Sequence, residues 1–598
     1  MESYNICGCF SRKFKKAELQ PPLDVIQSFN DYAEGGTAMS PEQLRRFMVD
    51  VQGEAAATTV ADAEKVVEEF MRHKHPHIFM FAKKSLTIDD FFTYLFSVDI
   101  NPPIKTQVDQ DMKSPLSHYF IYTGHNSYLT GNQLSSECSD IPIIQSLERG
   151  VRVIELDLWP TPNKEDVHVL HGKTLTPPVE LIKCLKAIKN YAFSASPYPV
   201  ILTLEDHLNP KLQAKVAQMI TQELGDMLFY PETEITKDFP SPDDLKYKVI
   251  VSTKPPKEYL SVDSSLSKGS ESQKNEQTSS VENIESRKDE QLSEEQTSIE
   301  NKINDDEKDE RERISEDQDS SDDTSKEENP TAYKNLITIP GVKRGKLKES
   351  LKVDPNKLSR LSWSEQTLAK AIISHGTDIV RYTQKNILRI FPKVARIDSS
   401  NYDPFVGWIH GAQMVAFNMQ GYGKPLWLMH GMFRANGGCG YIKKPEFLLK
   451  LSPKGEVFDP KADLPIKMTL KVKVYMGDGW RVDFKKTHFD LFSPPDFYVK
   501  AGIAGAAGDE TTMKRTKVIE DRWIPVWDEE FSFPLKVPEL ALLRVEVHEY
   551  DTSEKDDFAG QTCLPVSELK PGFHALPLYN FEGQKYASVK LLMRFMFV

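Results

Sequence analysis

The first half of the chain contains short apolar runs that predict buried β-strands. These runs are nearly apolar on both faces and rich in β-branched and aromatic residues, which is typical of strands inside a parallel sheet. A stretch with helical spacing of its apolar residues, 178–193, lies between two of them. Strands that alternate with helices predict a (β/α) barrel of the TIM type. The runs are "HYFIYTGHN" (118–126), "GVRVIELDLW" (150–159), "DVHVLHG" (166–172) and "YPVILTLEDH" (198–207).

The same alternation resumes after a long polar segment, at 368–392 and 411–420. We therefore expect one barrel in two halves, 103–255 and 341–455, split by a linker over 256–340. Such an insertion costs little closure entropy when both of its ends lie at the surface.

The regions on either side of the barrel follow other patterns. Repeated strands separated by turns predict an antiparallel β-sandwich over 466–581, with a last strand in 582–598 that completes it. Residues 20–102 are typical of helices, with Ser40 and Thr87 as expected N-caps. Residues 1–19 are expected to be a flexible basic N-terminus that contains cysteine.

The net charge of −13 is concentrated in one segment. Residues 261–330 hold 23 acidic and 9 basic residues, against 65 and 66 in the rest of the chain, and they include no aromatic residue and no cysteine. Such a composition cannot bury enough apolar surface to offset chain entropy, so we expect disorder. The simplest role for such a segment is that of a passive tether.

Composition limits the cellular setting. The chain is 39% apolar, which is enough for several cores, but it shows neither an apolar run long enough to span a bilayer nor a leading signal sequence. Six scattered cysteines do not match a disulfide framework or a zinc site. The sequence predicts a cytosolic protein with reduced thiols.

Polar residues end four of the predicted strands, where a parallel barrel places its active site. Glu155 and Asp157 are two apart and share one face of a strand. Together with Asn126 and Glu205 they form an all-oxygen ligand set that suits calcium or magnesium. Each residue alone is more typical of a solvated strand end, but four such ends in one barrel favour a site.

Two histidines, His125 and His171, follow strands of the same set. If they flank a reacting phosphodiester, one can donate hydrogen bonds to the developing negative charge. The other can protonate the leaving oxygen.

Several motifs carry a resemblance to a known family. "SHYFIYTGHNSYLTGNQL", "GVRVIELDLW", "VLHGKTLT", "YPVILTLEDH" and, beyond the linker, "ARIDSSNYDPFVGWIHGAQMVAFNMQ" and "NGGCGYIKKPEFLL" are similar to the X and Y boxes of eukaryotic phosphoinositide-specific phospholipase C. A short helical region before the X box resembles the plant-type members. The resemblance also implies an alternative to the passive tether, in which the acidic segment is a lid that competes with anionic membrane for the active-site face.

This resemblance implies a role for each candidate. His125 would stabilise the pentacoordinate phosphorane, and His171 would be the general acid toward the diacylglycerol oxygen. Glu155 would also accept the proton of the inositol 2-hydroxyl. The implied calcium ligands are Asn126, Glu155, Asp157 and Glu205. The implied headgroup contacts are Lys254, Ser362, Arg389 and Phe391, with Ser252 in place of a second family lysine and Phe391 in place of the usual tyrosine.

The C-terminal sandwich resembles a C2 domain, the calcium and phospholipid module. The implied calcium ligands are Asp496, Glu549, Asp551 and Asp557, whereas Ile524 replaces a usual ligand. The helical region resembles half of the family's EF-hand region. Its loop 31–42 lacks oxygen ligands at two positions, so we expect no calcium there.

The N-terminus places Cys7 and Cys9 beside four basic residues, a pattern that fits palmitoylation plus a basic cluster. The combined prediction is a calcium-dependent phospholipase C at the cytoplasmic face of the plasma membrane, or in the cytosol. It would cleave phosphatidylinositol 4,5-bisphosphate and related lipids to diacylglycerol and inositol phosphates. Its partners would be that lipid and an anionic membrane, not a nucleic acid, and no upstream regulator is indicated. A catalytically weak membrane scaffold is the alternative, and a glycerophosphodiesterase is a second rival.

Overall fold

The structure is a computed structural model, and it describes residues 2–7, 10–14, 18–74, 85–231, 237–256, 331–342, 347–354, 357–506, 508–552 and 555–598. The chain divides into two compact units, one of residues 110–421 and 438–461 and the other of 1–109, 422–437 and 462–598. The acidic segment 261–330 and Cys9 lie outside the described residues. Within these ranges, no helix combines the length and the apolar character needed to cross a bilayer.

The unit of residues 110–421 and 438–461 is built on a parallel sheet. Its eight strands follow the order β12-β11-β10-β7-β6-β15-β14-β13, and an isolated parallel bridge between Gly341 and Arg360 joins the two ends of that order. The predicted barrel is therefore confirmed. The strands are β6 (Thr123–Gly124), β7 (Val153–Pro160), β10 (Val200–Asp206), β11 (Val249–Thr253), β12 (Ile337–Pro340), β13 (Arg360–Ser364), β14 (Ile387–Phe391) and β15 (Met414–Phe417).

Short antiparallel strands extend this sheet at β7, and two others form a separate two-stranded sheet. β8 (Val167–Val169) pairs with β7 and with β9 (Val179–Glu180), while β16 (Tyr441–Lys443) pairs with β5 (Tyr119–Ile121). A layer of buried aliphatic side chains fills the amino-terminal end of the barrel. It includes Val153, Ile201, Ile250, Ile387 and Met414.

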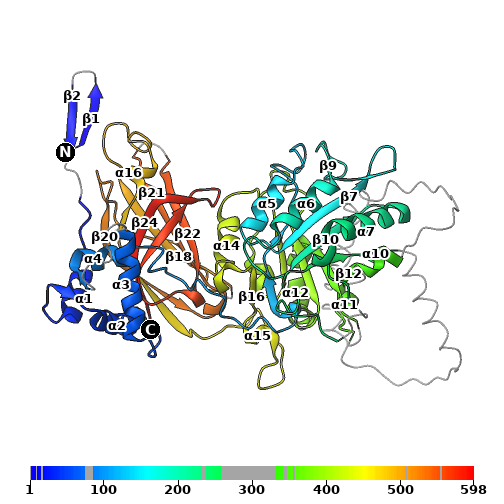
Figure 1. Cartoon of the computed structure of the whole chain (residues 1–598), viewed down its shortest axis with the longest axis horizontal. Helices are drawn as coiled ribbons and strands as arrows, with labels where there is room; N and C mark the ends of the chain where they lie inside the picture. The colour runs from blue at the N-terminus through cyan, green and yellow to red at the C-terminus, as the bar shows by residue number, and fades with distance from the viewer. Residues whose placement is uncertain are drawn as a thin grey trace, which may run out of the picture. The chain divides into compact units, whose positions relative to one another are not determined.

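Helices lie outside these strands (Figure 1). The longer ones are α5 (Ile141–Glu148), α6 (Leu181–Tyr191), α7 (Pro210–Leu224) and α12 (Glu365–Thr383). Ser364 caps α12 by accepting a hydrogen bond from Thr367 N. The short ones are α10 (Thr331–Asn335), α11 (Leu347–Ser350), α13 (Phe405–Trp408) and α15 (Glu446–Leu449).

The linker predicted over 256–340 ends too late. Its last residues form α10 and β12, and β12 pairs in parallel with β11. Ile339 is fully buried in the barrel core. This strand is only four residues long and follows a highly charged segment, so composition alone did not predict it.

The other unit begins with the predicted helices, α1 (Leu23–Ala33), α2 (Pro41–Asp50), α3 (Val60–Lys74) and α4 (Ile88–Leu95). Ser40 and Thr87 form capping boxes at α2 and α4, as their positions predict. The strands just before these two helices, β3 (Ala38–Met39) and β4 (Leu86–Thr87), pair antiparallel.

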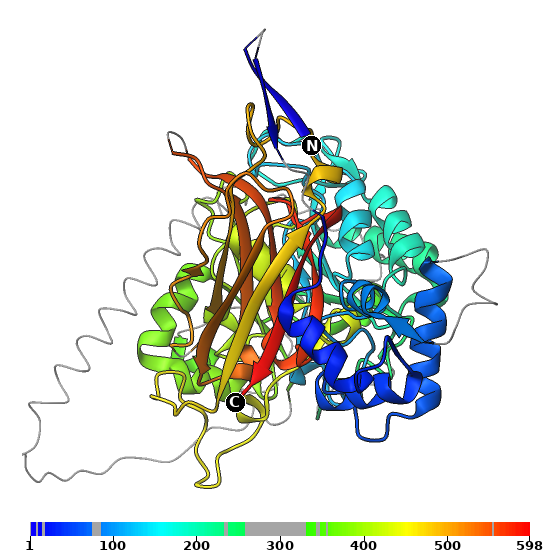
Figure 2. The ribbon, with the colours of Figure 1, turned by 90° about the vertical axis from the view of Figure 1, so that its left-hand side faces the viewer.

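An antiparallel sheet forms the rest of this unit, in the order β19-β18-β21-β22-β23-β24-β17-β20. Its strands fold around one apolar core, which confirms the predicted sandwich. Figure 2 shows the long strands β17 and β24 side by side, in gold and red. The strands are β17 (Met468–Asp478), β18 (Phe497–Ala504), β19 (Lys514–Arg515), β20 (Val526–Leu535), β21 (Leu542–Glu549), β22 (Asp557–Pro565), β23 (Gly572–Tyr579) and β24 (Lys585–Phe597), with helices α14 (Lys424–Met432) and α16 (Trp480–Asp483) beside them.

The helices and the sandwich share a second core. Phe573 and Leu592 of the sheet are buried among side chains of α1, α2 and α4. Gln52 closes this junction, because its side chain donates to Phe573 O at 2.8 Å and accepts from Phe573 N at 2.7 Å. The helical region is therefore part of the folded sandwich unit.

The N-terminus differs from the flexible segment expected. β1 (Glu2–Cys7) and β2 (Phe10–Phe14) pair antiparallel. Tyr4 is buried and accepts a hydrogen bond from Trp523 Nε1 at 2.8 Å, and Lys486 Nζ lies 3.8 Å from the centre of its ring. These partners stabilise the hairpin, and they lie too far away in the sequence for a local pattern to predict them.

Candidate active site

Three carboxylates meet at the carboxyl ends of two neighbouring strands. Glu155 and Asp157 lie on β7, and Glu205 lies opposite Asp157 on β10. One oxygen of each lies within 4.8 Å of the others. The parallel register and the two-residue repeat of the strands bring these groups together.

Asp157 and Glu205, which lie opposite each other in the register, differ in environment. Burial, reinforced by the charges of Glu205 and Glu155, raises the pKa of Asp157 well above its usual range. Tyr128 donates to Asp157 Oδ2 at 2.7 Å, but the buried Oδ1 has no partner among the described residues. Although burial opposes it, the hydrogen bond from His207 lowers the pKa of Glu205. His207 in turn stacks on Trp159, with 3.9 Å between ring centres.

Glu155 is held by an ion pair. Arg389 on β14 donates from Nη2 to both Glu155 oxygens at 2.5 Å, and both side chains are buried. Arg389 therefore contacts a carboxylate that the sequence predicts as a metal ligand, in addition to its predicted place near the headgroup.

His125 follows β6, and its Nδ1 lies 2.9 Å from Asn418 Oδ1. Asn418 donates from Nδ2 to Ser400 O, and its Oδ1 also accepts from Gln133 Nε2 at 3.1 Å. These contacts fix the amide, so His125 Nδ1 must be the donor. Burial, together with the charge of Arg389, lowers the pKa of His125.

His171 lies beyond β8, and its Nδ1 donates to the backbone carbonyl of Gln133 at 2.7 Å. The Nδ1 proton of each histidine is thus already used by a fixed acceptor. A proton on Nε2 of either ring therefore requires the imidazolium form.

Asn126 has positive φ, at 42°, and its backbone N–H donates to Glu155 Oε2 at 3.3 Å. Its Nδ2 donates to Gln133 Oε1 at 2.9 Å. The amide nitrogen is therefore occupied, which leaves Oδ1 as the group suited to a cation.

The predicted headgroup residues surround this centre on other strands. Phe391 on β14 stacks parallel to His125, with 6.5 Å between ring centres. Ser362 on β13 lies beside Arg389 in the register, whereas Lys254 follows β11 and is exposed. Ser252 is buried and donates to Ile339 O, so it supplies no charge.

The residues present fit a hard divalent cation. Their donors are oxygens, their negative charges repel one another, and Asp157 keeps one buried oxygen without a hydrogen bond among the described residues. Calcium or magnesium satisfies such a set better than zinc does.

The sandwich unit holds a second carboxylate cluster, with a different membership from the predicted one. Asp490, Glu549 and Asp551 bring oxygens within 4.8 Å of one another, while Asp496 and Asp557 fall outside this group. Burial, with the charges of Asp490 and Asp551, raises the pKa of Glu549 to about 8. Glu549 Oε2 is buried without a partner among the described residues.

Asp496 lies next to this cluster. Its Oδ1 accepts from Asp521 N at 2.7 Å, and its backbone N–H donates to Glu549 Oε1 at 3.4 Å. Burial, with the nearby charge of Asp490, raises the pKa of Asp496 to about 6. The only signal for Asp490 in the sequence is its place in the same loop as Asp496.

The sequence argument also missed three residues at the barrel site, Gln133, Asn418 and Tyr128. Gln133 and Tyr128 lie within the quoted motif around His125, but the motif alone does not show which of its residues form hydrogen bonds with the site residues. Asn418 follows β15, at the strand end where the barrel rule would have found it.

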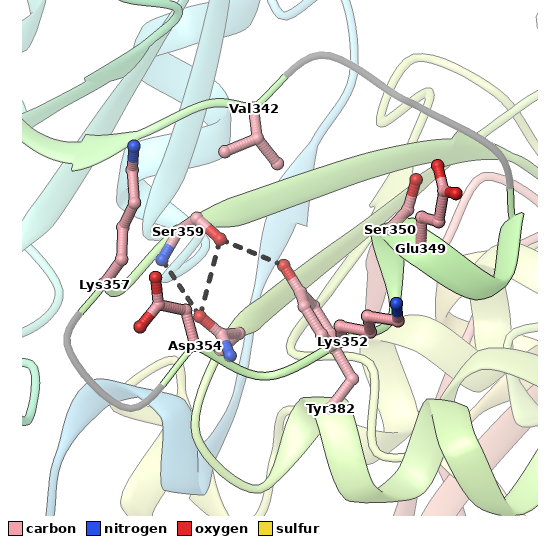
Figure 3. Close-up of a pocket in the computed structure, with 9 residues that line it drawn as sticks. Val342, Glu349, Ser350, Lys352, Asp354, Lys357, Ser359 and Tyr382 are labelled. Atoms are coloured by element: carbon pink, nitrogen blue, oxygen red, sulfur yellow. Dashed lines mark hydrogen bonds between the residues drawn. The ribbon is translucent and has the colours of Figure 1, made fainter. Parts of the chain in front are cut away.

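A cavity of about 320 Å³ lies elsewhere on the barrel (Figure 3). Its lining includes Lys352, Asp354, Ser359 and Tyr382, and Ser359 contacts the Tyr382 hydroxyl at 3.2 Å. None of the predicted site residues lines it.

Family models match most of the chain. The X domain of phosphatidylinositol-specific phospholipase C matches residues 112–255, and its Y domain matches 334–447. The C2 domain matches 468–580, and the EF-hand-like region of phosphoinositide-specific phospholipase C matches 17–102.

Individual proteins agree with these matches. Phosphoinositide phospholipase C 4 of Arabidopsis thaliana is 56% identical over 100% of this chain and 99% of its own length. The 1-phosphatidylinositol 4,5-bisphosphate phosphodiesterase delta-1 of Homo sapiens is 31% identical over 96% of this chain and 71% of its own. The crystal structure of S. officinalis PLC21 superposes with a TM-score of 0.72 at 24% identity, over 97% of this chain and 68% of that one, and supports the fold.

Proposed function

Because the chain belongs to the phosphoinositide-specific phospholipase C family, we propose that it hydrolyses phosphatidylinositol 4,5-bisphosphate and related lipids in a calcium-dependent reaction. The products would be diacylglycerol and inositol phosphates. The human relative is named for this lipid. The observation that carries the proposal is the cluster of Glu155, Asp157 and Glu205 beside two histidines whose Nδ1 atoms are fixed.

Calcium would be held by Asn126, Glu155, Asp157 and Glu205. When bound, it would lower the pKa of the inositol 2-hydroxyl and offset the charge of the phosphate. Asp157 Oδ1, which has no partner among the described residues, supports this assignment, as do the burial and the repulsion by neighbouring carboxylates that raise the pKa of Asp157.

The chain's own groups would move the protons. Glu155, which is held by Arg389, would accept the proton of the 2-hydroxyl as its oxygen attacks phosphorus. His125, as imidazolium, would donate from Nε2 to the negative charge that develops on the phosphoryl oxygens. His171 would give its Nε2 proton to the diacylglycerol oxygen as the phosphorus–oxygen bond breaks. Water would then open the cyclic diester, with His171 acting as the base.

The headgroup would lie between Phe391 and the cationic strand ends. Phe391 would stack on the inositol ring, while Lys254, Ser362 and Arg389 would contact its phosphates. The bond from Arg389 to Glu155 leaves Arg389 Nε without a partner among the described residues, which supports a second contact with an anion.

The sandwich would bring the enzyme to anionic membranes at the cytoplasmic face of the plasma membrane. Asp490, Glu549 and Asp551 would bind calcium there, next to Asp496. Acylation of Cys7 or Cys9 remains a prediction, because Cys9 and the side chain of Cys7 lie outside the described residues.

One experiment tests the whole proposal. Hydrolysis of phosphatidylinositol and its mono- and bisphosphates is measured across a calcium titration, with wild type and His125→Ala. Wild type should be active only with calcium, and the variant should lose at least two orders of magnitude, the upper range of a general acid-base contribution. An inactive wild type would favour the alternative of a catalytically weak membrane scaffold. A fully active His125→Ala variant would contradict the role assigned to His125. Cleavage of glycerophosphodiesters instead of lipid would favour the second rival.

A further inference from the structure

Arg360 is a buried cation of the barrel that the roles above leave unused. It begins β13, is 6% exposed, and has no hydrogen-bond partner for Nε or Nη1 among the described residues. We propose that Arg360 binds a ring phosphate of the inositol headgroup. This inference rests on the proposed function and adds a phosphate-binding residue to the same site.

The first argument is the position of Arg360. Residues two apart on a strand share a face, so Arg360 lies on the same face of β13 as Ser362. A side-chain carbon added at Gly341 would lie 3.2 Å from Arg360 Nη2 and 3.4 Å from Lys254 Cγ. The guanidinium group of Arg360 and the aliphatic part of Lys254 therefore both lie next to Gly341.

The strand order shows which part of a headgroup this point would meet. In the closed order, β12 lies four places from β6 in either direction. His125 follows β6, whereas Lys254 follows β11 and Arg360 begins β13, the two neighbours of β12. A lipid whose scissile diester contacts His125 would thus direct the opposite side of its inositol ring, with the phosphate monoesters, toward Arg360.

Arg152 shows how the same barrel buries a structural arginine. It is fully buried, and its guanidinium group donates to the carbonyl oxygens of Ala192 at 2.7 Å and Leu147 at 3.1 Å. Two of the three guanidinium nitrogens of Arg360 have no such acceptor among the described residues. Hydrogen bonds within the fold therefore account for the burial of Arg152 but not for that of Arg360.

Arg360 also lacks a direct ion-pair partner among the described residues, although the charges of Glu155 and Glu205 act on it. Burial and the charge of Arg389 lower the pKa of Arg360 to about 10, so the group stays protonated near neutral pH. Glu155 already pairs with Arg389, and Arg360 forms no ion pair within the described part of the chain. A buried guanidinium group whose N–H donors lack acceptors is unfavourable, and a phosphate monoester supplies paired acceptor oxygens together with negative charge.

The test compares Arg360→Met with wild type in the full chain. Hydrolysis of phosphatidylinositol, its 4-phosphate and its 4,5-bisphosphate is measured in matched mixed micelles at one calcium concentration. We expect kcat/KM for the phosphorylated lipids to fall roughly tenfold to a hundredfold, the usual range for a lost charged hydrogen bond. The value for phosphatidylinositol should change by less than about twofold, because that lipid lacks the ring phosphate. Arg360→Lys should lie between the two proteins, since it keeps the charge and loses the planar fork.

Lys357→Met is the matched control, because it removes an exposed cation just before the same strand, outside the proposed site. It should leave the ratio between the lipids unchanged. An equal fall on all three lipids, or no fall, in Arg360→Met would overturn the proposal, as would a rise on all three, which would indicate that Arg360 instead contacts an acidic part of the chain. If Arg360→Met does not fold, Arg360→Lys decides alone, and an unchanged lipid ratio overturns the proposal.

Binding of soluble inositol 1,4,5-trisphosphate, measured by calorimetry, separates this inference from the proposed function. If wild type showed no hydrolysis, weaker binding of the trisphosphate by Arg360→Met than by wild type would still support the contact. Equal binding by the two proteins would remove the contact while leaving hydrolysis untouched.

Discussion

Arg389 Nη2 lies 2.5 Å from both carboxylate oxygens of Glu155, and the two side chains are 5% and 2% exposed. A predicted calcium ligand is thus paired with a cation before any metal binds. The pair supplies a counterion in a setting where burial and neighbouring carboxylates make negative charge costly, as the raised pKa of Asp157 illustrates. Arg389 and calcium therefore act on the same negative charge.

Removing the arginine should couple stability to calcium. Arg389→Met leaves Glu155 buried and uncompensated, so the free energy of unfolding in a chelator should fall by about 3 kcal/mol. Calcium should restore more of that loss than it adds to wild type, because it replaces the missing charge. Urea unfolding followed by tryptophan fluorescence, with and without calcium, measures both effects.

Arg396→Met is the control for this prediction. It breaks another ion pair of the barrel, with Glu365, away from the three carboxylates. Its loss of stability should be the same with and without calcium. If Arg389→Met behaved in that way too, calcium would not act on the charge of Glu155.

Gln133 is a positioning residue shared by several site groups. Its backbone carbonyl accepts from His171, while its side chain contacts Asn418 and Asn126. Gln133→Ala keeps the carbonyl but loses these two side-chain contacts and a third, the hydrogen bond from Nε2 to Ser399 Oγ at 2.8 Å. We expect kcat to fall roughly tenfold to a hundredfold, as for supporting residues of metal sites, with KM within about twofold.

Gln420→Ala tests whether the effect is specific. Gln420 donates to Gly131 O and to Ser399 Oγ in the same network, but none of its hydrogen bonds reaches a histidine or Asn126. Its kinetics should stay near wild type. A rise in KM with unchanged kcat in Gln133→Ala would assign Gln133 to substrate binding instead of positioning.

The sandwich cluster gives a prediction that separates two aspartates. Asp490→Asn should weaken calcium-dependent binding to vesicles containing phosphatidylserine, because Asp490 belongs to the close cluster with Glu549 and Asp551. Asp557→Asn should have a smaller effect, since Asp557 lies outside that cluster and is exposed. Vesicle sedimentation across a calcium titration measures both. Equal losses of binding in the two variants would favour the ligand set that the resemblance implies, which includes Asp557.

The candidate site could be foreseen where a periodic rule applies. Two-residue alternation and the rule for parallel barrels were enough to bring Glu155, Asp157 and Glu205 together. Asp490 lies in an irregular loop, for which no period fixes the direction of a side chain. Gln133 holds His171 through a backbone carbonyl, which every residue has, so residue type carried no signal.

Partners far apart in the sequence account for the remaining differences. Tyr4 bonds to Trp523, and Gln52 bonds to Phe573, across most of the chain. Hydrophobic patterning predicts that such side chains are buried but not what they contact. Arg360 carried no signal in the sequence, because its guanidinium nitrogens without hydrogen-bond partners appear only in three dimensions.

The last prediction concerns the pH dependence of stability. His574 on β23 is 1% exposed; its Nε2 donates to Pro571 O at 2.9 Å, and Nδ1 has no partner among the described residues. Burial, which outweighs the opposing effect of the backbone groups of Pro571 and Asn101, lowers the pKa of His574 to about 4. A histidine in the unfolded chain titrates near pH 6.5, so on acidification the unfolded state binds the proton first. The contribution to stability should be complete above pH 6.5 and should fall by about 3 kcal/mol as the pH drops to 4.

His574→Gln removes the titrating group, so its free energy of unfolding should vary less than that of wild type between pH 6.5 and 4. His488→Gln is the matched control, because it removes an exposed histidine of the same unit and should leave the wild-type slope intact. Denaturant unfolding at several pH values gives the slopes. A His574→Gln slope equal to that of wild type would mean that other groups, such as the raised carboxylates of Asp496 and Glu549, dominate the acid response of this unit. Those carboxylates act with the opposite sign, since a raised folded pKa adds stability as the pH falls, so the two contributions can be told apart.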